Sequence, residues 1–372
     1  MRSDIQLALA CRFLPGTVLL ATLLAPPIFA QTPVPAPESK AAATEAPAAD
    51  PAATPWYENV KISGSIFGDG YWVTSHHEPA IEDQNGFWLR RLYLTFDYAI
   101  AEHWTARLRF EGNSPGDFKT NATIQPFVKD AYLAWKGKQV DLLMGISPSP
   151  TWDFIEGFWG YRAVEKTPLD LYRMGSSREF GVAARGKLAD GRVFYHATFG
   201  NGSTASETNE GKKAALAVGW KPTDAFIVEL YSDGEDRPGE TDRTTYQAFV
   251  GWKGEKSRYG FQYSSQERQV PAGPDQTLAI GSTFAVWNLC PKMSLIDRYD
   301  RSFDRNPEAD KIPYFVIAKD AEFDLALLGF DYRIAGKISL IPNVESVMYR
   351  ETAGNPAPDD DVIAKVTLYF QF

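Results

Sequence analysis

From Trp56 onward, apolar and polar side chains alternate strictly within short segments of this chain. Successive side chains of a β-strand point to opposite faces, so each such segment predicts a strand with one apolar and one polar face. The clearest case is 364–372, which ends at Phe372. Its apolar face is Ala364, Val366, Leu368, Phe370 and Phe372, and its other face is Lys365, Thr367, Tyr369 and Gln371. Alternation alone fits either a soluble β-sandwich or a membrane barrel.

Two further features favour a membrane barrel. Aromatic residues make up 13% of the chain and gather at segment ends, where bilayer interfaces would need them. Short turns and long polar connections also alternate, which predicts about 16 antiparallel strands with both ends on the short-turn side. The strands are predicted near 57–74, 87–100, 103–112, 126–136, 139–146, 179–187, 192–200, 212–221, 225–233, 243–253, 257–266, 276–289, 292–304, 323–335, 337–350 and 362–372.

The first 30 residues have the layout of a secretory signal peptide. Arg2 and Arg12 precede an apolar run, 17–25, and the segment ends on Pro-Ile-Phe-Ala at Ala30, after which we expect cleavage. Lipoprotein processing at Cys11 is an alternative, although most of the apolar run follows that cysteine. The Pro/Ala-rich leader, 31–55, is too poor in apolar side chains to fold and is predicted to be disordered. Residues 56–372 then form the barrel domain.

Charge and cysteine content exclude several partners. The net charge is −9 and becomes one unit more negative without residues 1–30, which argues against nucleic acid. Cys290 is the only cysteine after the signal peptide, so no intrachain disulfide is expected. His76-His77-Glu78 is interpreted as a solvated loop, because adjacent histidines on a flexible loop do not easily reach one ion. We therefore expect no metal and no cofactor.

Several stretches resemble the phosphate-selective porins O and P. They are FVKDAYLAW (127–135), GISPSPTWDFIEGFWGYRAVEKTPLDLYRMGSSREFG (145–181), YHATFGNG (195–202), SLIDRYD (294–300) and IPNVESVMYRE (341–351). The resemblance covers almost the whole chain after the leader. It implies a homotrimeric, 16-stranded porin of a Gram-negative outer membrane whose long third loop folds into the lumen.

The same resemblance implies a passive diffusion channel for small hydrophilic solutes, with the anion or phosphate preference of some family members. The implied partners are outer-membrane lipid and lipopolysaccharide, the solutes, and the barrel-assembly machinery. That machinery would read the last strand, with Phe372 as its insertion signal.

The longest connection, 147–178, is the predicted constriction loop, because a segment this rich in aromatic residues would not stay in water above the membrane. Its candidate residues are Trp152, Asp153, Glu156, Trp159, Arg162, Lys166, Asp170, Arg173 and Arg178. It lacks the dense lysine cluster of the phosphate-specific pattern.

Arginines recur on the predicted inward faces, at Arg91, Arg107, Arg109, Arg185, Arg258, Arg298 and Arg333. A planar guanidinium binds oxyanions with two hydrogen bonds, so these residues could form a ladder for phosphate or carboxylate. The plainer interpretation is that they pair with inward acids and brace the lumen. Those acids are Asp97, Glu111, Asp130, Glu229, Asp331 and Glu345.

A barrel enzyme, an adhesin-like barrel and a secreted carbohydrate-binding β protein are the alternatives to a channel. A barrel enzyme needs a nucleophile beside a base, and the four histidines suggest no such arrangement. An adhesin-like barrel or a secreted carbohydrate-binding β protein would use exposed aromatic residues, and the secreted form leaves the regular alternation of turns unexplained.

Overall fold

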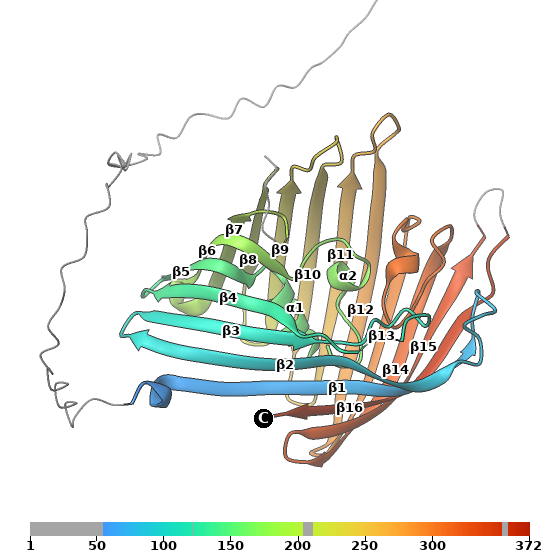
Figure 1. Cartoon of the computed structure of the whole chain (residues 1–372), viewed down its shortest axis with the longest axis horizontal. Helices are drawn as coiled ribbons and strands as arrows, with labels where there is room; N and C mark the ends of the chain where they lie inside the picture. Colours follow the sequence, from blue (N-terminus) through green and yellow to red (C-terminus); the bar gives the residue numbers. More distant parts are fainter. Residues whose placement is uncertain (1–54, 122, 204–210, 352–355) are drawn as a thin grey trace, which may run out of the picture. The chain divides into compact units, whose positions relative to one another are not determined.

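The protein is a closed antiparallel β-barrel (Figure 1). A computed structural model describes residues 55–121, 123–203, 211–351 and 356–372. Each strand pairs with its neighbour in sequence, and β1 closes the ring on β16. The predicted 16-stranded fold is therefore confirmed. The predicted signal peptide and all but the last residue of the leader lie outside the described residues.

The strand bounds lie within three residues of the prediction throughout. A short 3-10 helix, Trp56–Asn59, precedes the first strand. The strands are β1 (Val60–Ser75), β2 (Asn85–Ala101), β3 (Trp104–Gly112), β4 (Phe127–Lys136), β5 (Val140–Pro148), β6 (Arg178–Leu188), β7 (Val193–Gly200), β8 (Lys213–Trp220), β9 (Phe226–Glu235), β10 (Arg243–Lys253), β11 (Ser257–Arg268), β12 (Gln276–Cys290), β13 (Met293–Ser302), β14 (Glu322–Ala335), β15 (Ile338–Arg350) and β16 (Asp361–Gln371). Among the described residues, no helix is long and apolar enough to cross a membrane.

The two faces of the wall differ as the alternation predicted. In β16, Val366 and Leu368 point outward and are exposed, whereas Lys365 and Thr367 point inward and are buried. Phe372 is exposed beside Phe370, with ring centroids 5.7 Å apart. An outward apolar band around a polar interior is the arrangement that a bilayer requires of a barrel.

Two β-bulges interrupt the alternation on neighbouring parts of the wall. The register of β2 against β1 skips Arg90, and that of β4 against β3 skips Lys129. A bulge opposes two residues to one, which re-aims a side chain. As a result Arg90 and Arg91 are both buried on the inner side, and Lys129 lies beside inward Asp130. Strict alternation would have placed Arg90 and Lys129 toward the bilayer.

The connection between β5 and β6, residues 149–177, folds into the barrel, and we call it the inner loop. It contains α1 (Trp152–Trp159) and α2 (Pro168–Leu171), which Figure 1 shows inside the ring of strands. Aromatic side chains fasten it to the inward face of β7 to β12: ring centroids lie 4.7 Å apart for Phe154 and Phe194, and 4.9 Å apart for Trp159 and Phe284. This confirms the predicted inward-folded third loop.

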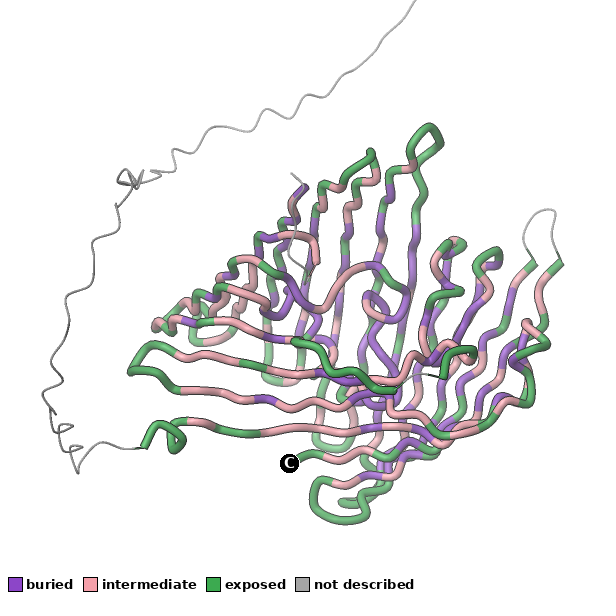
Figure 2. Tube along the Cα trace, viewed as in Figure 1, coloured by how far each residue is buried: buried purple, intermediate pink, exposed green. Residues whose placement is uncertain are grey.

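A second long connection, residues 303–321 between β13 and β14, also turns inward, contrary to the expectation of a polar loop there. Its run Ile312 to Ile317 is largely buried. Figure 2 colours the buried residues of the whole barrel purple. Tyr314 reaches the β3–β4 connection, where its hydroxyl donates to the Ser114 carbonyl at 2.5 Å and its N–H to the Gly116 carbonyl at 2.7 Å. A side chain at Gly116 would meet the Tyr314 ring at 2.6 Å, so this approach requires glycine.

Candidate functional site

Charged side chains of the inner loop face charged side chains on the inward face of β2 to β4, and we call the region between the two sets the passage. On the loop side, Arg162 pairs with Glu156 at 2.9 Å and with Asp170 at 3.3 Å. Lys166 adds a contact of 3.4 Å to Asp170. These side chains keep part of their surface open, so they are available to water and solutes.

The facing wall carries its own chain of ion pairs. Glu111 binds Arg91 at 2.8 Å and Lys129 at 3.0 Å. A few residues further along the wall, Arg107 binds Asp97 at 2.7 Å and Arg109 approaches Asp130 at 3.4 Å. The bulge in β4 contributes to this chain of ion pairs, because it brings Lys129 to the inward face.

Arg178 links the wall to the inner loop. This residue begins β6 rather than lying in the loop, and it binds Asp130 of β4 together with Asp153 of α1, the latter at 3.0 Å. A single guanidinium thus joins two carboxylates from the two sides of the passage.

The loop and the wall interact electrostatically across the passage. Burial by itself would raise the pKa of Asp170, but Lys166 and Arg162, and then Lys129 and Arg91 from the wall, bring that pKa below its ordinary value. Asp170 therefore stays ionised at neutral pH. Cations and carboxylates thus alternate on both sides of the passage.

Behind the passage, a buried network fixes the inner loop to the barrel. Arg90 donates to the Val164 carbonyl and binds Glu165 at 2.8 Å. Lys365 lies 2.6 Å from Glu345 and 4.0 Å from Glu165. Burial would raise the pKa of Glu165, but Arg90 and Lys365 lower it to about 2, so the loop is anchored by a carboxylate that remains charged.

Two of the predicted lumen arginines also anchor the inner loop to the barrel and do not line the passage. Arg258 donates to the Trp159 carbonyl at 2.7 Å, and Arg298 donates to the Lys166 carbonyl while pairing with Asp300. Both guanidinium groups donate to backbone carbonyls of the inner loop, because the loop covers that part of the wall.

The other residues predicted from the sequence lie in several different parts of the lumen. Trp152 and Trp159 are buried and pack the inner loop. Arg185 lies 3.8 Å from Asp141, and Arg333 donates to the Pro291 carbonyl at 3.2 Å, both toward the short-turn end. Of the inward acids, Glu229 binds Thr151, Asp331 binds Tyr161, and Glu345 binds Lys365, so the expected pairing with arginine holds only for Asp97, Glu111 and Asp130.

A cluster of arginines at the long-loop end had not been predicted as a group. Glu308, on the second inward loop, is shared by Arg173 at 3.9 Å, Arg243 at 3.4 Å and Arg268 at 3.3 Å. Lys311 approaches the same carboxylate at 4.0 Å. One acid among four cations leaves this end of the passage positive. The cluster joins four segments, namely the inner loop, β10, β11 and the second inward loop, which no local pattern reveals.

A cavity of about 510 Å³ lies at the other end, between α1 and the short turns. Asp153 lines both this cavity and the passage. The basic residues of its lining outnumber the acidic ones: Lys138, Arg185, Lys187 and Lys221 against Asp141, Asp153 and Glu229.

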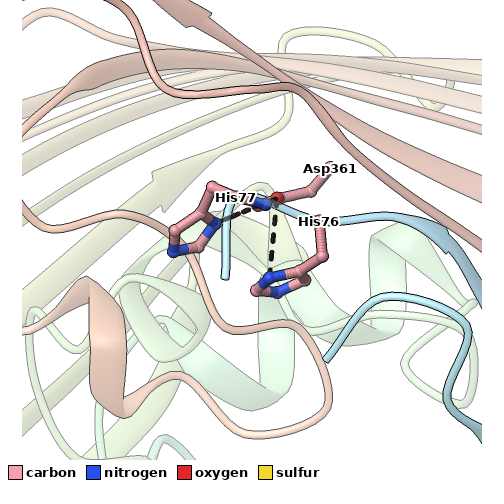
Figure 3. Close-up of side chains that lie close together, drawn as sticks. All are labelled: His76, His77 and Asp361. Atoms are coloured by element: carbon pink, nitrogen blue, oxygen red, sulfur yellow. Dashed lines mark hydrogen bonds and ion pairs between the residues drawn. The ribbon is translucent and has the colours of Figure 1, made fainter. Parts of the chain in front are cut away.

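The adjacent histidines after β1 are not in a solvated loop. His76 is 6% exposed, and both imidazoles turn toward Asp361 at the start of β16 (Figure 3). Their rings stack with centroids 4.4 Å apart. These adjacent histidines therefore do reach one point, contrary to the expectation from the sequence.

No family model matches the sequence, and a search of curated proteins finds no match. Among similar solved structures is the anion-selective porin from Comamonas acidovorans, with a TM-score of 0.64 and 11% identity over 84% of this chain and 99% of that chain. The outer membrane channel DcaP of Acinetobacter baumannii has a TM-score of 0.60 and 13% identity over 84% of this chain and 97% of that chain. The in-vitro folded trimer form of OmpT, an outer membrane protein of Vibrio cholerae, has a TM-score of 0.58 and 12% identity over 84% of this chain and 99% of that chain. The chain therefore has the fold of outer-membrane porins and channels. The narrower resemblance to the phosphate-selective porins stays a prediction.

Proposed function

We propose that this protein is a diffusion channel in the outer membrane of a Gram-negative bacterium, passing small hydrophilic solutes with a modest preference for anions. The observation that carries the proposal is the passage itself, a lining of alternating ion pairs between the inner loop and β2 to β4. Such a lining replaces part of a solute's hydration without holding it tightly, as a conducting pore requires.

The pairing of charges argues for weak rather than phosphate-specific selection. Arg91, Arg107, Arg109, Lys129 and Arg162 each have a carboxylate within 3.4 Å, so none presents an uncompensated charge to an oxyanion. The anion preference would arise at the two ends, from the cations around Glu308 and from the lysines of the cavity near the short turns.

Single-channel recording in planar bilayers under a salt gradient tests this function. We expect stepwise openings and a reversal potential shifted modestly toward anions. A purified, folded protein that gives no stepwise conductance would overturn the channel proposal. A channel that conducts but prefers cations would overturn only the anion preference.

The substitution Glu308→Gln should increase the preference for anions, because Arg173, Arg243 and Arg268 lose the carboxylate they share. At an effective separation of about 4 Å in water one charge contributes about 1 kcal/mol, which corresponds to about a fivefold change in the anion-to-cation permeability ratio. The reversal potential measures that ratio. Glu267→Gln is the matched control, because Glu267 neighbours Arg268 in β11 but is exposed. An equal shift in both variants would show that overall charge, rather than this cluster, sets the selectivity.

We further propose that the barrel forms homotrimers through the outer face of β3 to β7. Most of these strands are short, and their outward residues line an apolar groove of about 720 Å³ that includes Leu133, Leu142, Met144, Val182 and Phe199. A low, apolar wall that is poorly matched to the thickness of a bilayer favours coverage by another copy.

Met144→Arg should abolish the trimer, because Met144 is 70% exposed within this groove. Leu328→Arg, on the outward side of β14, is the control that adds the same charge elsewhere. Both carry an insertion cost of about 2–4 kcal/mol, so folding is affected alike in the two variants. Chemical crosslinking and light scattering in detergent would report the assembly. Trimers that persist in Met144→Arg would place the contact on another wall.

The lipid partners would meet the outward ion pairs near the long-loop end, where Arg350 binds Asp324 at 2.6 Å and Glu322 at 3.2 Å. Charged groups at that level suit lipopolysaccharide head groups. The barrel-assembly machinery would act on β16, whose outward apolar residues end at Phe372. An enzymatic role finds no support in the passage, because among the described residues its charged groups are engaged in ion pairs without a nucleophile beside a base.

A further inference from the structure

His76, His77 and Asp361 converge from opposite ends of the chain, where β1 and β16 close the barrel (Figure 3). One possible ligand atom from each lies within 4.8 Å of the others. The Asp361 carboxylate is 2.9 Å from Nδ1 of His77 and 3.9 Å from Nδ1 of His76. From these positions, we propose that the three side chains form a binding site for a transition-metal ion of the Zn²⁺ class. The proposal is independent of the channel function.

The hydrogen bonds around His76 leave the required nitrogen free of a proton. Nδ1 of His76 accepts a bond from the Glu78 N–H at 2.9 Å, so in the neutral ring the proton sits on Nε2. Nε2 is buried and has no hydrogen bond of normal geometry, although it approaches the Val316 carbonyl closely enough to interact with it. Metal-binding histidines usually donate their second ring N–H to such an oxygen. A metal ion bound at Nδ1 would replace the Glu78 N–H on that lone pair, and the same nitrogen lies 3.9 Å from the Asp361 carboxylate.

The second observation is a small void beside the cluster. It measures about 10 Å³ and is lined by His76 and Asp361 together with apolar neighbours such as Phe118, Phe315 and Val316. A space of this size corresponds to about one water-sized sphere. The void lies beside two of the three proposed ligands, so binding of a single ion by all three requires small movements of their side chains.

Tyr349 of β15 positions the carboxylate. Its hydroxyl donates to Oδ2 of Asp361, lies 3.2 Å from Nδ1 of His77, and accepts the Ala318 N–H at 2.9 Å. The His77 N–H also donates to Oδ1 of Asp361 at 2.7 Å. The carboxylate is thus held in one orientation by groups from several segments, as second-shell residues hold a metal ligand.

The ligand set selects the ion. Two imidazoles and one carboxylate suit Zn²⁺, Cu²⁺ or Ni²⁺, whereas Mg²⁺ and Ca²⁺ prefer oxygen ligands only. Three protein ligands leave a fourth tetrahedral position for water. The bound ion would tie the segment after β1 to β16 and to the second inward loop.

Binding of Zn²⁺ to the purified, folded protein tests the proposal, measured by calorimetry and by competition with a chromogenic chelator. We expect one high-affinity Zn²⁺ per chain and, with Co²⁺, the visible absorption of a tetrahedral site. His77→Gln and Asp361→Asn should weaken binding at least about tenfold, since each removes a ligand. His103→Gln, which changes an exposed histidine far along the chain, should bind as the wild type does.

Tyr349→Phe separates a metal site from a merely structural cluster, because it keeps all three ligands and removes only the hydroxyl. It should fold normally and bind Zn²⁺ about tenfold more weakly. Wild-type protein that binds no Zn²⁺, or binding that is unchanged in His77→Gln and in Tyr349→Phe, would overturn the proposal. Weakening by His103→Gln as strong as by His77→Gln would assign the binding to scattered surface histidines and overturn it as well.

Discussion

Arg90→Ala should lower the free energy of unfolding of the barrel by about 3–5 kcal/mol, because it leaves a buried carboxylate without its partner. Arg90 is 1% exposed and binds Glu165 at 2.8 Å, with Asp69 3.6 Å away. The Lys365 ammonium, 4.0 Å from Glu165, is too distant to compensate fully. Urea unfolding in detergent, followed by the different gel mobilities of folded and unfolded barrel, would measure the loss.

Arg107→Ala is the control for that experiment. It removes a similar guanidinium from a pair with Asp97 in which both side chains remain accessible to water. Such pairs contribute at most about 1 kcal/mol. If the two variants were destabilised equally, the inner loop would not depend on the buried network, and its aromatic packing would have to supply the anchoring.

Lys129→Glu should shift the permeability ratio toward cations by more than about tenfold. The substitution reverses a charge 3.0 Å from Glu111 and acts on Asp170 across the passage, so three carboxylates would face one another. A change of two charge units at about 1 kcal/mol each in water exceeds the 1.4 kcal/mol that a tenfold ratio requires. The reversal potential in a salt gradient gives the ratio directly.

Lys129→Gln should produce about half of that shift, and Arg333→Glu much less. Arg333 was predicted on the same kind of inward face, but it is exposed near the short turns, where its guanidinium donates to the Pro291 carbonyl. A reversal of selectivity by Arg333→Glu as large as by Lys129→Glu would move the selecting region from the inner loop to the short-turn end.

The strands of the barrel and their bounds could be predicted from the sequence because each strand is encoded by residues that are close together in the chain. Alternation and turn residues depend on near neighbours in sequence, and so even β12 and β13, where Asp297 breaks the alternation, were placed correctly. The aromatic residues of α1 likewise identified the inner loop, since they would be unstable in water.

The contacts within the lumen could not be predicted in this way. Lys129 reaches the passage only through a bulge, which depends on the register between β3 and β4. His76 and Asp361 lie at opposite ends of the barrel domain and meet only because the ring closes. The apolar run around Phe315 was a signal for the second inward loop, and it went unused because long connections were assumed to be polar.

The anchor of the inner loop has a consequence for the order of assembly. Glu165 is held by Arg90 from β2 and by Lys365 from β16, which lie on either side of β1, so its complete binding site exists only after the last strand has joined the first. Until then the loop has half of its anchor and a buried carboxylate with an incomplete set of partners. We therefore expect the inner loop to dock completely only after the ring of strands has closed, so that ring closure precedes the final arrangement of the lumen.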